Sequence, residues 1–140
     1  MEDAAVERLW PGGRAVFAPL SGGITNRNFR VDVDGETYVL RIPGQDTELL
    51  GIDRQAEYAA GVRAAEIGVG PEVIRYVEPE GWTVTRFIAG RRVPLAGVRS
   101  PGMIDRVATA VRAFHEAAPI SGKFDAHAIV EQYARLARSR

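Results

Sequence analysis

An Asp-Gly pair inside an alternating strand pattern constrains the fold of this chain more than any other feature of its sequence. Residues 31–42 read VDVDGETYVLRI, with Asp34 and Gly35 between two runs of alternating character. A two-residue type I′ turn needs positive φ at both central positions, which Asp and Gly tolerate well. We therefore predict a β-hairpin. Its second strand has Tyr38, Leu40 and Ile42 on one face and Val39 and Arg41 on the other.

The letters DVDG also resemble the start of a calcium-binding loop. In such a loop the later ligand positions would fall on the residues YVL, and no Glu closes it. The hairpin is the better interpretation.

The remaining segments predict an antiparallel sheet with one helix inserted after its third strand. A helix begins at Asp53, which can cap the free amides, and ends at Gly68, which can adopt a left-handed conformation. The fold class is therefore α+β, with a five-stranded sheet followed by further helices. The other predicted strands are 15–21, 28–33, 72–77 and 82–88, and the other predicted helices are 3–9, one capped by Ser100, and one that begins near Asp125.

Composition limits the classes of function. At 140 residues the chain has the usual size of one domain, and its 18 basic residues balance 18 acidic ones, so we expect neither nucleic acid nor a membrane surface as a partner. There is no Cys, and the two His residues lack the spacing of a paired metal motif, so any metal must be held by oxygen atoms. The acidic N-terminus and the lack of a long apolar run predict a cytoplasmic protein.

The stretch LSGGITNRNF carries more glycines, hydroxyls and amides than a tight turn needs. Backbone N–H groups at a Gly-rich loop can approach phosphate oxygens, because no Cβ atom stands in the way. A cation on the third strand, Arg41, would reach the same phosphates, and a carboxylate on the following helix, Glu57, would hold that cation. The alternatives are a plain hairpin turn, a solvated Arg in an Arg-rich chain, and a Glu on a helix surface.

Four stretches together identify a family. In order along the chain, LSGGITNRNFRV, YVLRIPG, IDRQAEYAAGVRAAEIGVGPEVI and VTRFIAG resemble the choline/ethanolamine kinase group, within the wider aminoglycoside phosphotransferase and kinase-like fold. The resemblance covers about residues 18–135. It implies a kinase-like N-terminal lobe and the ATP- and Mg²⁺-dependent phosphorylation of a small alcohol.

The resemblance also implies roles for individual residues. Arg41 contacts the phosphates and Glu57 pairs with it, while the backbone of Arg86 and Ile88 meets the adenine. Arg86 stands where the family usually has an acidic residue, a change that a backbone contact tolerates. The loop residues that would cover the phosphates are Ser21, Gly22, Gly23, Thr25 and Asn26.

Residues that the family uses for catalysis are absent from this sequence. Family members have a catalytic Asp in an H-x-D loop, an Asn shortly after it, and a further Asp that holds Mg²⁺. Here the only asparagines are Asn26 and Asn28, and the late acids fall in helical patterns without a His two residues before them. We therefore expect no catalytic residue and no metal ligand in this chain. Those acids are Asp105, Glu116, Asp125 and Glu131.

These observations predict the ATP-binding lobe of an ATP-dependent small-alcohol kinase, inactive alone. Residues 1–90 would form the nucleotide-binding lobe and 91–140 a connector with the first helices of an incomplete second lobe, the chain being truncated or completed by a separate lobe. The apolar faces within 104–136 would then bind the missing lobe or a second copy. The alternatives are an inactive nucleotide-binding or interaction module and a scaffold that binds no nucleotide. The sequence does not distinguish among the alcohols, and His115 is expected to be a packed or half-exposed residue.

Overall fold

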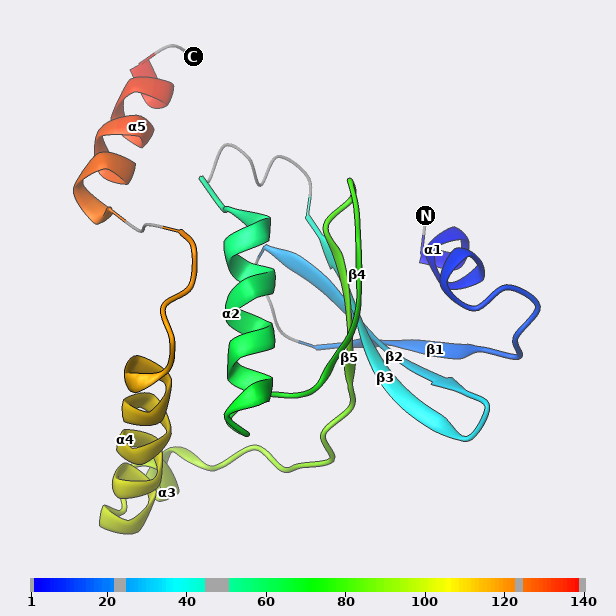
Figure 1. Cartoon of the computed structure of the whole chain (residues 1–140), viewed down its shortest axis with the longest axis horizontal. Helices are drawn as coiled ribbons and strands as arrows, with labels where there is room; N and C mark the ends of the chain where they lie inside the picture. Colours follow the sequence, from blue (N-terminus) through cyan, green and yellow to red (C-terminus); the bar gives the residue numbers. More distant parts are fainter. Residues whose placement is uncertain (1, 22–24, 45–50, 123–124, 139–140) are drawn as a thin grey trace.

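The computed structural model describes residues 2–21, 25–44, 51–122 and 125–138. It confirms the predicted α+β class: one five-stranded antiparallel sheet with a helix inserted after the third strand (Figure 1). Gly22 and Gly23 lie outside the described residues. The elements are α1 (Glu2–Leu9), β1 (Val16–Leu20), β2 (Asn26–Val33), β3 (Glu36–Pro43), α2 (Arg54–Glu66), β4 (Val73–Val77), β5 (Trp82–Arg86), α3 (Leu95–Val98), α4 (Pro101–Glu116) and α5 (Ala126–Arg138).

The sheet has the strand order β1-β2-β3-β5-β4, and all of its neighbours are antiparallel. The predicted hairpin is confirmed, because Asp34 and Gly35 both have positive φ, 52° and 81°. Strand β2 begins two residues earlier than predicted, at Asn26, because Asn26 still pairs with Pro43 at the far end of β3. Strand β5 ends at Arg86, two residues earlier than predicted.

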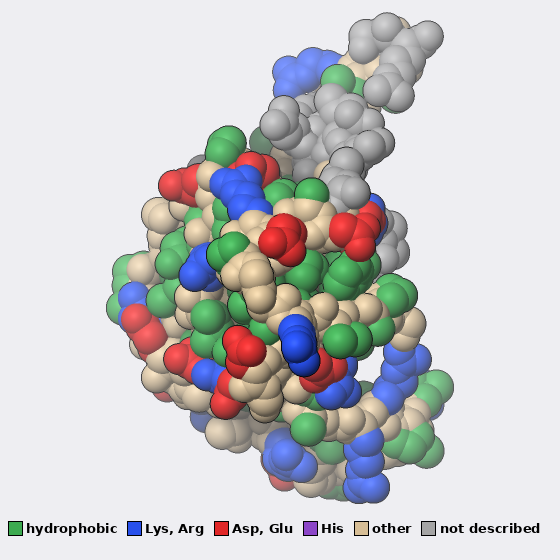
Figure 2. Space-filling model, turned by 90° about the vertical axis from the view of Figure 1, so that its right-hand side faces the viewer, with side chains coloured by type: hydrophobic (Ala, Val, Ile, Leu, Met, Phe, Trp, Pro, Cys, Tyr) green, Lys and Arg blue, Asp and Glu red, His purple; other side chains and the backbone are tan. Residues whose placement is uncertain are grey.

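The hydrophobic core lies between α1 and one face of the sheet. Strand alternation directs Leu40 and Ile42 into this core, where their exposed fractions are 0% and 2%, as the hairpin pattern predicts. Trp10, just after α1, packs on Tyr38 with ring centroids 5.7 Å apart. On the side of the molecule that carries α1, acidic and basic side chains are interspersed (Figure 2). The remaining buried core residues are Ala5, Val6, Leu9, Phe29, Val31, Val33 and Val84.

Helix α2 lies on the opposite side of the sheet from α1 (Figure 1). It begins where predicted, since the Asp53 carboxylate accepts a hydrogen bond of 3.0 Å from the Ala56 N–H. It ends before Gly68, whose φ of 73° is the left-handed conformation expected there. No residue of α2 is fully buried, so the helix covers the sheet without sealing this face.

The C-terminal helices pack loosely. The short helix α3 was not predicted, and it changes how α4 begins: the Ser100 hydroxyl donates to the Gly97 carbonyl (2.8 Å) instead of capping the amides of α4. The Asp125 carboxylate does cap α5, at 3.1 Å from the N–H groups of His127 and Ala128. Within the described ranges, none of the helices combines the length and apolar character needed to cross a membrane.

The predicted apolar face of α4 is exposed to solvent except at its last residue, Phe114, which is half-buried. Ile104, Val107 and Val111 have exposed fractions of 54%, 53% and 47%, and no residue of α4 is buried. The segment that leads to α5 does touch the rest of the molecule, because a Cβ atom at Gly122 would lie only 2.7 Å from the Cβ of Ala56 on α2. Because no residue of α4 is buried, its apolar side chains add little to the core of this chain.

Candidate functional site

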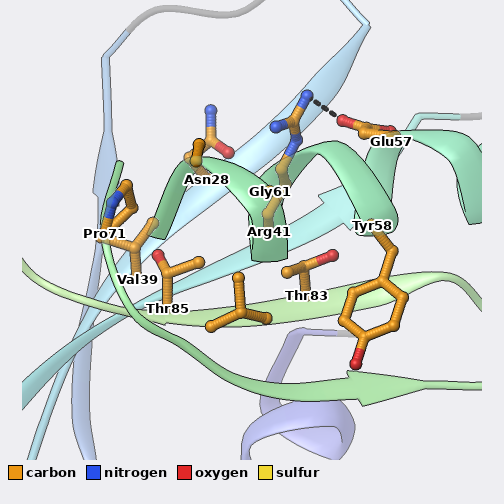
Figure 3. A pocket seen from close by; sticks show the side chains of 11 residues that line it. Asn28, Val39, Arg41, Glu57, Tyr58, Gly61, Pro71, Thr83 and Thr85 are labelled. Carbon is orange, nitrogen blue, oxygen red and sulfur yellow. Dashed lines mark ion pairs between the residues drawn. The ribbon is translucent and has the colours of Figure 1, made fainter. Parts of the chain in front are cut away.

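A cavity of about 260 Å³ lies between α2 and the sheet face that does not contact α1. One wall is formed by side chains that alternate with the core residues along β2, β3 and β5. Small residues of α2 form the opposite wall (Figure 3). The cavity is thus a direct consequence of strand alternation combined with a helix that presents Gly and Ala to the sheet. The lining residues are Asn28, Val39, Arg41, Glu57, Tyr58, Gly61, Ala64, Pro71, Val73, Thr83 and Thr85.

Arg41 and Glu57 form an ion pair at this cavity, as the sequence predicts (Figure 3). Arg41 comes from β3 and Glu57 from the first turn of α2, and their side chains are 45% and 30% exposed. Because the guanidinium is both held by a carboxylate and open to solvent, it can also bind an anion from outside the protein.

The neighbours of Arg41 within the sheet are polar. In the strand register Asn28 lies opposite it on β2 and Thr83 on β5. An amide and a hydroxyl therefore flank the guanidinium, and both are hydrogen-bonding groups. Asn28 was not predicted as a site residue, although counting back from the two-residue turn would have placed it opposite Arg41.

Arg54 also contacts Glu57 and was missed by the sequence analysis. Its Nη1 lies 2.6 Å from Glu57 Oε2, whereas Arg41 binds Oε1. The signal in the sequence was the spacing of three residues within one helix, which places Arg54 and Glu57 on the same side. The charged cluster at the cavity thus consists of two cations, Arg41 and Arg54, and one anion, Glu57.

Three of the residues predicted to cover the phosphates, Ser21, Thr25 and Asn26, do not line the cavity. The side chains of Thr25 and Asn26 are hydrogen-bonded to each other, with Asn26 Nδ2 donating to Thr25 Oγ1 at 3.3 Å. The Thr25 carbonyl accepts a hydrogen bond of 2.8 Å from the Gly44 N–H. Ser21 is exposed. Asn26 belongs to β2 and not to the loop, so it is a strand residue at the end of the sheet where β3 finishes.

Arg86 has its side chain on the core side of the sheet, away from the cavity. It pairs with Glu36, lies 3.5 Å from Glu72, and stacks over the Tyr38 ring at 5.3 Å. Its backbone N–H donates to the Glu72 carbonyl at 2.9 Å. The side chain of Ile88, beyond the end of β5, is 63% exposed.

Two shifted pKa values bear on the sheet, one at its hairpin end, away from this cavity, and one beside the cavity wall. Hydrogen bonds from Arg30 and from the Thr37 hydroxyl lower the pKa of the Asp32 carboxyl. Burial raises the pKa of Tyr76, whose ring stacks on that of Tyr58 with centroids 4.5 Å apart. Tyr58 lines the cavity, so this aromatic pair supports one of its walls.

The acidic residues late in the chain lie where the helical pattern places them. Asp105 and Glu116 belong to α4, Glu131 belongs to α5, and Asp125 caps α5. In the part of the chain that the structure describes, no three His, Asp or Glu side chains come together as a metal site would require.

The fold and the ion pair together define the class: a kinase-like N-terminal lobe, with a cation on the third strand held by a carboxylate on the inserted helix. The chain belongs to the phosphotransferase enzyme family abbreviated APH, whose family model matches residues 16–139. None of the curated proteins compared matches the chain in sequence.

Solved structures share this fold. A choline/ethanolamine kinase family protein from Mesorhizobium loti is 30% identical, with a TM-score of 0.71, over 96% of this chain and 45% of that protein. The choline kinase LicA from Streptococcus pneumoniae is 20% identical, with a TM-score of 0.73, over 96% of this chain and 46% of that one. The aminoglycoside phosphotransferase APH(4)-Ia, in a ternary complex with AMP-PNP and hygromycin B, is 21% identical, with a TM-score of 0.56, over 84% and 39%. This chain therefore spans less than half the length of these relatives.

Proposed function

We propose that this chain is the ATP-binding part of an ATP-dependent phosphotransferase that acts on a small alcohol, as choline or ethanolamine kinases do. Arg41 contacts the phosphates of ATP, and Glu57 holds Arg41 in the conformation that does so. One observation carries the proposal: the Arg41–Glu57 ion pair lies at an open cavity between α2 and the sheet. Exposed arginine–carboxylate pairs also occur elsewhere on this chain, as between Arg8 and Glu80, so the pairing alone does not assign Arg41 to a ligand. What supports the assignment of Arg41 is that both members of its pair line this cavity.

The adenine and the loop complete the proposed nucleotide site. The backbone of Arg86 and Ile88 meets the adenine. The phosphates are covered by Ser21, Gly22, Gly23 and Thr25, and by Asn26 at the start of β2. Support for assigning these residues to a nucleotide comes from the similarity to relatives, one of which was solved with AMP-PNP. The Arg86 side chain is engaged with Glu36, so only its backbone is assigned to the ligand.

The chemical step is assigned to groups outside this chain. Phosphoryl transfer needs a base or positioning residue for the alcohol and carboxylates for Mg²⁺, and the described residues supply no such cluster. We therefore propose that residues 1–90 form the nucleotide-binding lobe, that 91–140 are a connector and the first helices of a second lobe, and that this chain alone is inactive. The exposed apolar residues of α4 and α5, such as Val107 and Val130, are the proposed contact with the second lobe.

Calorimetry with Mg-ATP tests the proposal. We expect the wild-type chain to bind, and Arg41→Met to weaken binding about tenfold or more, since hydrogen bonds to charged groups contribute roughly 1.5–3 kcal/mol. Arg8→Met is the matched control: Arg8 is 50% exposed and paired with Glu80, and it stacks on Trp82, a partner of the core on the α1 side of the sheet. No heat from a folded wild-type chain at millimolar Mg-ATP would overturn the proposed function. Equal losses for both variants would overturn the assignment of Arg41.

A further inference from the structure

The carboxylate of Glu57 is divided between two arginines. Its Oε1 pairs with Arg41 across the cavity, and its Oε2 pairs with Nη1 of Arg54 at 2.6 Å. Arg54 is the more buried of the two cations, with 18% of its side chain exposed against 45% for Arg41. Glu57 therefore has one partner fixed within the protein and one that faces the cavity.

Arg54 occupies a position that is unfavourable for helix stability. It is the first residue of α2, next to the Asp53 cap, where the helix dipole disfavours a positive charge. Within the described part of the chain its Nη2 atom is buried without a hydrogen-bond partner, which adds a cost of desolvation. The ion pair with Glu57 offsets these costs. The helix alone would be as stable with an uncharged residue here, so the arginine is better explained by its contact with Glu57.

The turn between β4 and β5 restricts the Arg54 side chain. Gly81 is buried, with φ of 69°, and a Cβ atom there would lie 3.5 Å from Cγ of Arg54 and 3.7 Å from Cγ of Pro43. The stem of Arg54 thus lies against the backbone of this turn, near the end of β3. A guanidinium held in this way limits the rotamers available to the carboxylate that it binds.

From this geometry we infer that Arg54 is a positioning residue for the anion site: it holds Glu57 Oε2 so that Oε1 is presented to Arg41. Its consequence for ATP rests on the proposed function, whereas the positioning itself is a property of the three side chains. Arg54 is too buried to replace Arg41 at the cavity, so it acts through Glu57 and not on the ligand.

Two measurements on Arg54→Met test this inference. In ¹⁵N NMR the Arg41 Nε–H signal, assigned by its loss in Arg41→Met, should move toward its position in Glu57→Gln. In calorimetry the affinity for Mg-ATP should fall about fivefold, the effect typical of a partly exposed ion pair, whereas the affinity for adenosine, which has no phosphates, should stay the same. In the Glu57→Gln background, Arg54→Met should have no further effect on either reading.

The control is Arg63→Met. Arg63 forms the same type of pair three residues apart on α2, with Glu66 at 2.6 Å, and it too has a buried nitrogen without a partner among the described residues. This variant should lower stability by a similar amount without moving the Arg41 signal. If Arg54→Met does not fold, Arg54→Gln, which keeps part of the side-chain stem, replaces it.

The outcomes separate the two ideas. An unchanged Arg41 signal in folded Arg54→Met, or an effect of Arg54→Met that persists in the Glu57→Gln background, overturns the inference. A wild-type chain that binds no Mg-ATP overturns the proposed function instead, and the Arg41 signal then still decides whether Arg54 positions Glu57.

Discussion

Neighbouring residues of β3 serve opposite sides of the sheet. Leu40 and Ile42 are buried against α1, while Val39 and Arg41 line the cavity under α2. The period of two residues along a strand is sufficient to produce this separation. A substitution on β3 can therefore affect either the stability of the core or the cavity, depending on which face of the sheet its side chain lies on.

Leu40→Ala should lower the free energy of unfolding by about 2–5 kcal/mol, because Leu40 is fully buried and the truncation leaves a cavity. Urea denaturation followed by circular dichroism measures the change. Leu95→Ala is the control, since Leu95 is 72% exposed, and it should change stability by less than about 0.5 kcal/mol. Similar losses in the two variants would contradict the placement of the core.

The lowered pKa of Asp32 predicts how stability depends on pH. Arg30 and the Thr37 hydroxyl lower its pKa in the folded state, so its contribution to stability is fully present above the unfolded pKa of about 3.9. That contribution is lost as the pH falls through the lower, folded pKa. The difference in stability between wild type and Asp32→Asn should thus be constant near neutral pH and shrink in acid. A difference that grows in acid would contradict the shift.

At the scale of the elements, the first turn of α2 connects helix stability with the site. The Asp53 carboxylate caps the helix at Ala56, and the backbone N–H of Glu57 donates to the Asp53 carbonyl at 3.0 Å. Glu57, which holds Arg41, therefore belongs to the turn that Asp53 stabilises. Fraying of this turn would release the carboxylate from Arg41.

Asp53→Ala should cost about 1 kcal/mol of stability, which is typical for the loss of a cap, and should also weaken Mg-ATP binding. Asp125→Ala is the matched variant: Asp125 caps α5 with bonds of 3.1 Å, and none of the described residues of α5 lines the cavity. Thermal denaturation and calorimetry on both variants distinguish the effects. Weakened binding in Asp125→Ala, or unchanged binding in Asp53→Ala, would contradict the connection.

In the whole molecule, stability is concentrated in α1 and the sheet. All nine buried hydrophobic residues in the described part of the chain belong to α1, β2, β3 or β5. Helix α4 has no buried residue: Ile104, Val107 and Val111 are exposed, and Met103 and Phe114 are half-buried. The two parts of the chain should therefore open with very different free energies.

Amide hydrogen exchange measures this difference. We expect strong protection in β2, β3 and β5, around Val31, Leu40 and Val84, and weak protection in α4. Equal protection throughout would show that α4 is covered in solution. In that case size-exclusion chromatography with light scattering would identify a second copy of the chain as the cover.

Local signals in the sequence were sufficient for much of this fold. Asp34-Gly35 determined the hairpin, its register and the separation of Leu40 from Arg41, because turn geometry and strand alternation depend only on nearby residues. Asp53 and Gly68 likewise marked the ends of α2. The pairing of Arg41 with Glu57 was predicted from a cation on the third strand and a carboxylate on the following helix, and the family resemblance implied the same pair.

Only the tertiary structure decided the rest. The sharing of Glu57 between Arg41 and Arg54 depends on how α2 lies across the sheet, and the exposure of Val107 depends on what packs against α4. The Ser100 hydroxyl bonds to Gly97 because α3 forms just before it. Each of these features arises from the relative placement of separate elements, and periodicity within one element carries no information about its distance from another.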